Sequence, residues 1–394
     1  MIGNIAERIT AILPEIAKRS AEIDALANVP ADLLAKIEQA GGFSMATPVE
    51  FGGAAMSLRA ICKVIFDVAT ADASLAWQMG TAVGTQILTA RLPHATLVRY
   101  YETGPDTWAK GAYTPKTVAQ PVEGGYRLTG RWPFASGARQ YEWVALGFMV
   151  ADGKGVKMMP DGQRPDIRVG LLRKDAVKVI ETWNVVGLRG TRSDDLEVTD
   201  LFIPEAWQGS FFGGSNLDAP VLNAAMPSAT APLHSSIMLG IVQAAMNDLA
   251  QSSLTRRAAS NPRMFLKDDP VFLNGFGILC SKFNSLKALN ADSIDTLELI
   301  TAAGRETDPL SDAKLCSDGS YVNHECLKIM DEIMTYAGAS AIYNENAQQR
   351  RWRDLRCAAQ HQAANTGNFG RYGNVLLSMT EPNETNLQLT ASAA

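Results

Sequence analysis

The chain has 394 residues, 46% of them hydrophobic, and a formal net charge of −5. This length allows two or three domains with a large core. The acidic balance argues against nucleic acid or an anionic membrane as a partner. No segment reaches about 18 uncharged apolar residues, and the N-terminus has no apolar run of signal-peptide length, so we expect a cytoplasmic protein.

Hydrophobic periodicity divides the chain into three predicted domains. Over residues 1–106, apolar residues recur every three or four positions, as at Ile5, Ile9 and Ile12, which predicts helices. Over residues 107–208 the pattern changes to alternation with glycine-rich turns, which predicts a small β domain. Over residues 209–394, a connector rich in Gly, Ser and Pro leads to long apolar stripes, which predict a four-helix bundle.

The five cysteines are odd in number, widely spaced and contain no Cys-x-x-Cys pair. This pattern indicates buried thiols and argues against a disulfide framework or a zinc site. We therefore expect no metal.

Four motifs carry a resemblance to a known family. They are Pro48 to Gly53, Gly125 to Gly137, Gly187 to Ser193, and Arg353-Asp354-Leu355-Arg356. Their order is similar to that of the acyl-CoA dehydrogenase superfamily over almost the whole chain. The resemblance implies an α+β fold with an N-terminal helical domain, a middle β-barrel-like domain and a C-terminal four-helix bundle. It also implies a homotetramer, because the bundles of this family pack together.

The residue at the dehydrogenase base position is different in this chain. In the common dehydrogenases a Glu after the Arg-Asp-x-Arg helix takes the substrate α-proton, and here that place holds Gln362, preceded by His361. An amide cannot accept a proton. His361 and the Gly-x-Trp-x-Phe-x-Ser-Gly segment instead resemble the two-component flavin-dependent monooxygenases. We expect His361 on the last long helix, near its ordinary pKa of about 6.5, with His234 and the other histidines distant from it.

The monooxygenase resemblance implies a set of site residues. The cofactor would be reduced flavin, FMNH2 or FADH2, with O2 as co-substrate, reacting through a C4a-hydroperoxyflavin. Catalytic roles are implied for His361 and Ser136. Flavin contacts are implied for Trp108, Gly111, Tyr113, Thr114, Trp132, Phe134, Ser136 and Gly137, and substrate contacts for Thr85, Gln86 and His361.

The segment from Trp132 to Gly137 also has a physical interpretation. Alternating aromatic side chains can lie beside a flat flavin ring, and Ser136-Gly137 allows a close approach of the backbone. In the other interpretation, Trp132 and Phe134 are ordinary core residues and Ser136-Gly137 is an ordinary turn.

Two positions depart from close relatives. Phenol-hydroxylating relatives have a histidine where Thr85 stands, and a hydroxyl cannot act as the base for a phenol at neutral pH. This departure favours heteroatom oxidation or hydroxylation of a non-phenolic ring. Arg192 stands where close relatives have glycine.

No dinucleotide-binding glycine motif follows a predicted strand, so reduced flavin would come from a separate NAD(P)H:flavin reductase. The substrate would be a small aromatic, heteroaromatic or heteroatom-containing compound. Two alternatives stay open: an acyl-CoA dehydrogenase or oxidase with a relocated base, and a non-catalytic scaffold that binds flavin or an acyl group.

Overall fold

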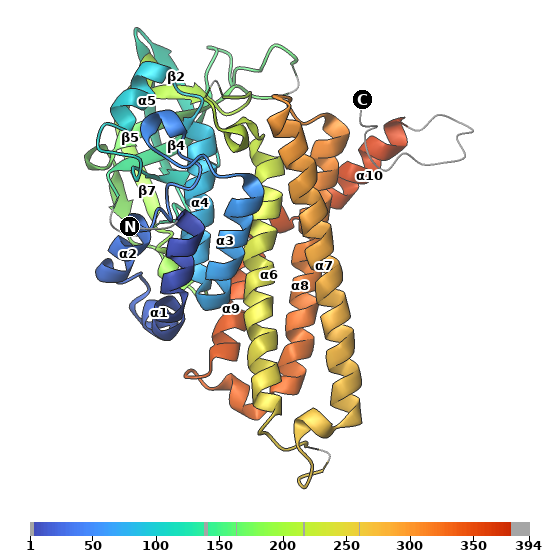
Figure 1. Ribbon diagram of the computed structural model, residues 1–394. Helices are drawn as coiled ribbons and strands as arrows, with labels where there is room; N and C mark the ends of the chain where they lie inside the picture. The colour runs from blue at the N-terminus through green and yellow to red at the C-terminus, as the bar shows by residue number, and fades with distance from the viewer. Residues whose placement is uncertain (1–3, 138–140, 163, 216, 260, 380–394) are drawn as a thin grey trace.

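The computed structural model describes residues 4–137, 141–162, 164–215, 217–259 and 261–379. Helices at the N-terminus, a curled mixed sheet and long C-terminal helices follow one another along the chain (Figure 1). This order confirms the predicted α+β fold. The ends of the first and third predicted domains, residues 1–3 and 380–394, lie outside the described residues.

The N-terminal helices enclose one helix that is buried on nearly every side. They are α1 (Ile5–Leu26), α2 (Ala31–Gln39), α3 (Leu58–Ala71), α4 (Ala73–Thr89) and α5 (His94–Tyr100). The Asp72 carboxylate caps α4 by accepting from the Leu75 amide at 2.8 Å, and it also accepts from the Ser20 hydroxyl at 2.7 Å. Because α4 packs against α3, α6 and β1, its side chains lie where the domains meet.

The sheet has eight strands: β1 (Ala109–Ala112), β2 (Val118–Val122), β3 (Gly125–Trp132), β4 (Trp143–Val150), β5 (Ile167–Arg173), β6 (Lys178–Ile180), β7 (Asp195–Pro204) and β8 (Gln208–Ser210). Their order is β6-β7-β3-β2-β4-β5-β8, and β1 pairs with β4 in parallel. Buried apolar side chains of the strands form a core of their own within the sheet domain. β8 lies across the predicted domain boundary at residue 208.

Up to residue 379, the described part of the C-terminal region contains three long helices and two short ones. They are α6 (Met226–Ser253), α7 (Pro270–Ala302), α8 (Pro309–Ala337), α9 (Ala347–Ala358) and α10 (Gly367–Met379). The expectation of a fourth long helix is therefore wrong, because α9 ends at Ala358 and the next α-helix begins only at Gly367. His361 lies in this break and not on a helix. None of the described helices is long and apolar enough to cross a membrane.

Candidate active site

His361 lies in the break between α9 and α10, where α8 holds the backbone. Asn323 donates to the Ala363 carbonyl at 3.2 Å, and the His324 ring bonds the Ala364 carbonyl at 2.9 Å. The Ala363 amide donates to His361 Nδ1 at 3.2 Å. A ring nitrogen that accepts a hydrogen bond carries no proton, so the neutral His361 ring carries its proton on Nε2.

The surroundings of His361 keep its imidazole neutral. Burial and, second, the neighbouring His234 lower the pKa of His361 to about 3. The expectation of a pKa near 6.5 is therefore wrong. Because Nδ1 is occupied and Nε2 carries the proton, the ring is a hydrogen-bond donor to the site and not a ready base.

His234, on α6, forms part of the same cluster. Its ring stacks on that of His361, with centroids 5.0 Å apart and planes 17° apart. The Trp77 indole lies edge-on to both imidazoles, at 5.4 and 5.5 Å. The expectation that His234 is distant is wrong. The only sequence signal for His234 was a histidine inside an otherwise apolar helical stripe.

Ser136 accepts from the Trp77 indole and begins a chain of hydroxyl groups. Trp77 Nε1–H donates to Ser136 Oγ at 3.0 Å. Ser136 Oγ is 2.7 Å from Ser193 Oγ, which is 2.8 Å from Thr191 Oγ1. Thr191 donates its hydroxyl proton to the Leu188 carbonyl at 2.8 Å.

The two ends of this chain fix its direction. An indole N–H can only donate and a carbonyl can only accept. Because Thr191 donates its hydroxyl proton to the Leu188 carbonyl, Thr191 can only accept from Ser193. Ser193 therefore donates to Thr191, and Ser136 donates to Ser193. Ser136 Oγ therefore accepts from Trp77 and keeps one lone pair for another donor.

An exposed apolar surface adjoins Ser136. Phe134 is 68% exposed and Val186 is 67% exposed. The Phe134 ring lies edge-on to Trp183 at 6.2 Å. Phe134 has φ +60°, a left-handed conformation that turns its side chain out of the strand pattern. Exposed aromatic and aliphatic groups beside a hydroxyl fit a flat ring system such as flavin.

The Arg353-Asp354 pair on α9 holds the loop that carries this surface. Arg353 donates to the Val186 carbonyl, and Asp354 accepts from the Leu188 amide at 2.6 Å. A side chain at Gly187 would collide with the Arg353 backbone. Burial raises the pKa of Asp354 to about 7. The motif that carried the family resemblance thus positions the Thr191–Ser193 segment.

Gly111 connects Ser136 with two further predicted residues, Tyr113 and Thr85. Gly111 forms a bridge with Ser136 across the strands, and a side chain at Gly111 would collide with the Tyr113 hydroxyl. That hydroxyl bonds Thr85 Oγ1, which donates to the Thr81 carbonyl at 2.9 Å. The structure therefore brings Tyr113 and Thr85 into contact, with Gly111 next to both Tyr113 and Ser136.

Two predicted residues are not available to a ligand. Trp132 is fully buried, and its Nε1–H donates to the Gly147 carbonyl at 2.7 Å, so it is a core residue of the sheet. The Gln86 amide donates to Thr47 Oγ1 at 2.7 Å and accepts from the Ala46 amide at 3.3 Å. The predictions that Trp132 contacts flavin and Gln86 contacts substrate are corrected accordingly.

Trp108 and Thr114 flank β1. The Trp108 ring stacks on Phe43 at 4.9 Å, and its Nε1–H donates to Glu38 at 3.1 Å, so this side chain faces the N-terminal helices. Thr114 is exposed. Their flavin contacts stay predictions.

Lys110 on β1 fixes the two turns beside Ser136. Its Nζ donates to the carbonyls of Gly137 at 3.1 Å and Arg192 at 3.0 Å. Arg192 has φ +45°, a conformation that favours glycine, and its guanidinium pairs with Asp194 at 3.1 Å. This backbone conformation explains why glycine suits position 192 in close relatives.

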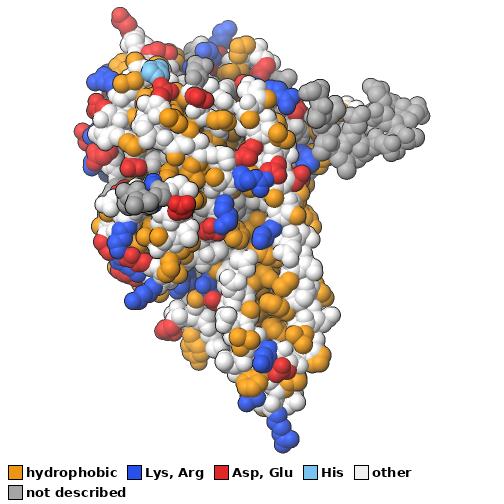
Figure 2. All heavy atoms as spheres, viewed as in Figure 1, with side chains coloured by type: hydrophobic (Ala, Val, Ile, Leu, Met, Phe, Trp, Pro, Cys, Tyr) orange, Lys and Arg blue, Asp and Glu red, His pale blue; other side chains and the backbone are white. Residues whose placement is uncertain are grey.

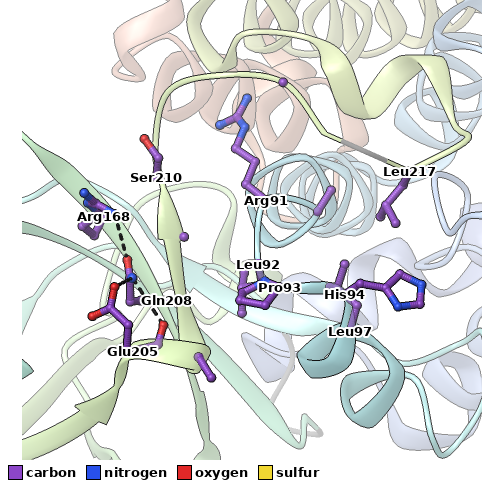
Figure 3. A pocket seen from close by; sticks show the side chains of 14 residues that line it. Arg91, Leu92, Pro93, His94, Leu97, Arg168, Glu205, Gln208, Ser210 and Leu217 are labelled. Carbon is purple, nitrogen blue, oxygen red and sulfur yellow. Dashed lines mark hydrogen bonds between the residues drawn. The ribbon is translucent and has the colours of Figure 1, made fainter. Parts of the chain in front are cut away.

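A cleft lies elsewhere on the molecule. It has a volume of about 620 Å³ and is lined by residues that include Arg91, His94 and Arg168 (Figure 3). Its polar side chains are engaged: Gln208 donates to the Glu205 carboxylate at 3.0 Å, and Arg91 donates to two backbone carbonyls. The cleft contains neither Ser136 nor His361, so we place the candidate active site at the hydroxyl and imidazole cluster.

Fold and site together define an enzyme with the acyl-CoA dehydrogenase architecture. The family model described as the acyl-CoA dehydrogenase N-terminal domain matches residues 9–91, and that of the C-terminal domain matches residues 233–366. The chain belongs to the acyl-CoA dehydrogenase family.

Relatives across most of the chain are oxygenase components of flavin-dependent monooxygenases. Indole-3-acetate monooxygenase of Acinetobacter baumannii is 27% identical over 360 residues, covering 90% of this chain and 89% of the relative. The flavin-dependent monooxygenase oxygenase subunit HsaA of Rhodococcus jostii is 27% identical over 391 residues, covering 92% and 98%. The structure of XiaF from Streptomyces, in complex with FADH2 and glycerol, has a TM-score of 0.86 at 23% identity, covering 95% of each chain.

Proposed function

We propose that this chain is the oxygenase component of a two-component monooxygenase. It takes FMNH2 or FADH2 from a separate NAD(P)H:flavin reductase. One atom of O2 enters the substrate and the other leaves as water, while the reduced flavin is oxidised. The observation that carries this proposal is the neutral His361 donor next to Gln362, which occupies the position where a dehydrogenase needs a carboxylate.

The site supports capture of the reduced form of flavin. Phe134 and Val186 offer an apolar surface to the ring, and Ser136 Oγ has one lone pair that is free to accept a hydrogen bond. Reduced flavin carries a hydrogen on N5, whereas oxidised flavin does not. When bound, reduced flavin supplies the two electrons that activate O2. A hydroxyl that can only accept favours the reduced form.

His361 holds oxygen in this proposal and does not remove a proton. Its low pKa keeps the ring neutral at physiological pH, so its Nε2–H can donate to the oxygen being transferred. Of the two roles that its position implies, stabilising oxygen and accepting the substrate proton, the geometry supports the first.

The surroundings of Thr85 support an aromatic substrate. Thr85 donates to Thr81, so its bond with Tyr113 uses the Tyr113 hydroxyl proton. The Tyr113 oxygen then remains an acceptor. A small aromatic ring bearing an N–H or O–H fits these neighbours, as does a heteroatom compound. Relatives are named for indole-3-acetate and resorcinol.

We also propose a homotetramer formed through the long helices. Figure 2 shows apolar side chains gathered along the lower part of these helices, where α7 begins. Val271, Leu273 and Ile278 on α7 are all exposed. Exposed apolar residues on successive turns of one helix are typical of an interface between subunits.

The dehydrogenase alternative lacks a base in the described part of the site. Gln362 is exposed and is an amide, and the Asp354 carboxylate accepts from the Leu188 amide at 2.6 Å. The scaffold alternative does not explain why Ser136 and His361 both contact the same indole.

The test supplies the purified chain with a flavin reductase, NADH, FMN or FAD and ¹⁸O2. The substrate panel includes indole-3-acetate, resorcinol and dibenzothiophene, and the control reaction contains the reductase without this chain. We expect one ¹⁸O atom in the product. Bleaching of bound oxidised flavin by an acyl-CoA without oxygen, and no ¹⁸O product, would instead support a dehydrogenase.

A further inference from the structure

The two stacked imidazoles have opposite hydrogen-bond partners: His234 faces acceptors, and His361 Nδ1 faces a donor. The His234 Nε2 is 2.9 Å from the Ala358 carbonyl, and its Nδ1 is 3.2 Å from Asn323 Oδ1. The Asn323 amide nitrogen donates to the Ala363 carbonyl, which fixes its oxygen toward His234. Both His234 nitrogens therefore face acceptors.

An imidazole that faces two acceptors satisfies both only when both nitrogens carry hydrogen, which is the protonated ring. His361 is the reverse case, because its Nδ1 accepts from the Ala363 amide and its hydrogen bonds suit the neutral ring. Two cations stacked at 5.0 Å repel each other, so protonation of one ring opposes protonation of the other.

We propose that His234 is a positioning residue that takes the first proton of this pair and thereby keeps His361 a neutral Nε2–H donor. The bond from His234 to the Ala358 carbonyl also fixes the start of the segment that carries His361. This inference rests on the proposed function only for the role of His361 toward oxygen.

Burial disfavours the charged form of both imidazoles, but the other contacts of the two rings differ. The pKa of His234 falls to about 4, because burial lowers it more than the bonds to the Ala358 carbonyl and Asn323 Oδ1 raise it. The pKa of His361 falls to about 3, through burial and, second, through His234. The bonds that favour charge on His234 have no counterpart at His361, in agreement with the hydrogen-bond geometry.

The other titratable groups on the packed elements point elsewhere. On α9, Asp354 bonds the Leu188 amide and Cys357 accepts from the Gly187 amide. On α8, His324 bonds the Ala364 carbonyl, and Cys326 is buried. α4 carries no titratable side chain. Besides burial, the pKa of His361 is therefore affected by His234, and the pKa of His234 by its bonds to the Ala358 carbonyl and Asn323.

The chain has only four histidines, so selective ¹⁵N labelling of histidine gives a spectrum that single substitutions can assign. We expect His361 to show the neutral Nε2–H form across the range in which the protein stays folded, and His234 to protonate first as the pH falls. Protonation of His361 before His234, or a proton on Nδ1 of neutral His361, would overturn the inference.

Asn323→Asp should move the protonation of His234 to a higher pH, at which the titration is easier to follow. A carboxylate opposite Nδ1 should raise the His234 titration by about 1–3 pH units, and His361 should stay neutral. The serine hydroxyl of Ser320 still donates to the Ala363 carbonyl, so the segment keeps a support. If His361 took the proton in this variant, or if His234 did not shift, the proposal would fail.

His234→Gln removes the repulsion, so the His361 titration should move upward, and the low-pH loss of product per NADH should begin at a higher pH. The matched control is His324→Gln, which loses a bond to the same segment but does not stack on His361. A merely structural role predicts equal effects in both variants, and that result would refute the inference. If the wild type gives no oxygenated product, the proposed function fails while the titrations still decide the roles of the two rings.

Discussion

Replacing Ser193 with alanine should reduce the preference of the site for reduced flavin. In the structure the Ser136 proton lies in a 2.7 Å hydrogen bond to Ser193, so Ser136 can offer only a lone pair to a ligand. Without Ser193 Oγ, the Ser136 proton is free to turn toward N5 of oxidised flavin. Oxidised flavin should then bind more tightly, while reduced flavin changes little.

The magnitude follows from one hydrogen bond. A neutral hydrogen bond contributes about 1 kcal/mol net, which is ~5-fold in affinity. We therefore expect the ratio of the two dissociation constants to shrink by about 5-fold. Thr191→Val should have a larger effect, because Ser193 would then donate back to Ser136 and turn it into a donor.

The assay is a pair of titrations, one with oxidised flavin in air and one with reduced flavin under anaerobic conditions. The control is Ser253→Ala, the same change at a buried serine near the far end of α6, where the hydroxyl bonds only the Ala250 carbonyl. An unchanged ratio in Ser193→Ala, or weaker binding of oxidised flavin, would refute the directed hydroxyl chain.

Four other outcomes are expected. His361→Ala should keep flavin binding but release most oxygen as hydrogen peroxide, measured as peroxide against product; normal coupling would remove His361 from the mechanism. Trp132→Phe should lower Tm by a few degrees, about 2–4 °C for 1 kcal/mol, without changing flavin affinity, because this ring is core; a large loss of affinity would restore the flavin contact. Ile278→Glu should dissociate the oligomer in light scattering, whereas Val122→Glu on the sheet should not. The raised pKa of buried Asp354 means that the folded state binds a proton that the unfolded state lacks between about pH 4 and 7, so stability falls as pH rises through this window; Asp354→Asn should flatten that fall in Tm, and an unchanged slope would contradict the assignment.

The sequence by itself determined the family architecture and two central residues. Periodicity separated helices from strands because helical and strand faces repeat at different intervals. His361 and Ser136 could be found because each stands at a fixed distance from a motif, in Arg353-Asp354 and in the Gly-x-Trp-x-Phe segment. The missing carboxylate at Gln362 was equally visible, since it depends only on which side chain occupies one position.

The tertiary structure decided which side chains meet and which way each hydrogen bond runs. His234 and Trp77 join the site only because α6 and α4 pack beside the break after α9, and no local pattern encodes that contact. Trp132 and Phe134 alternate in sequence, yet one is core and the other exposed, because the strand ends at Trp132 and Phe134 takes a left-handed backbone conformation. Donor and acceptor roles at Ser136 and His361 depend on partners far away in sequence, so only the folded chain fixes them.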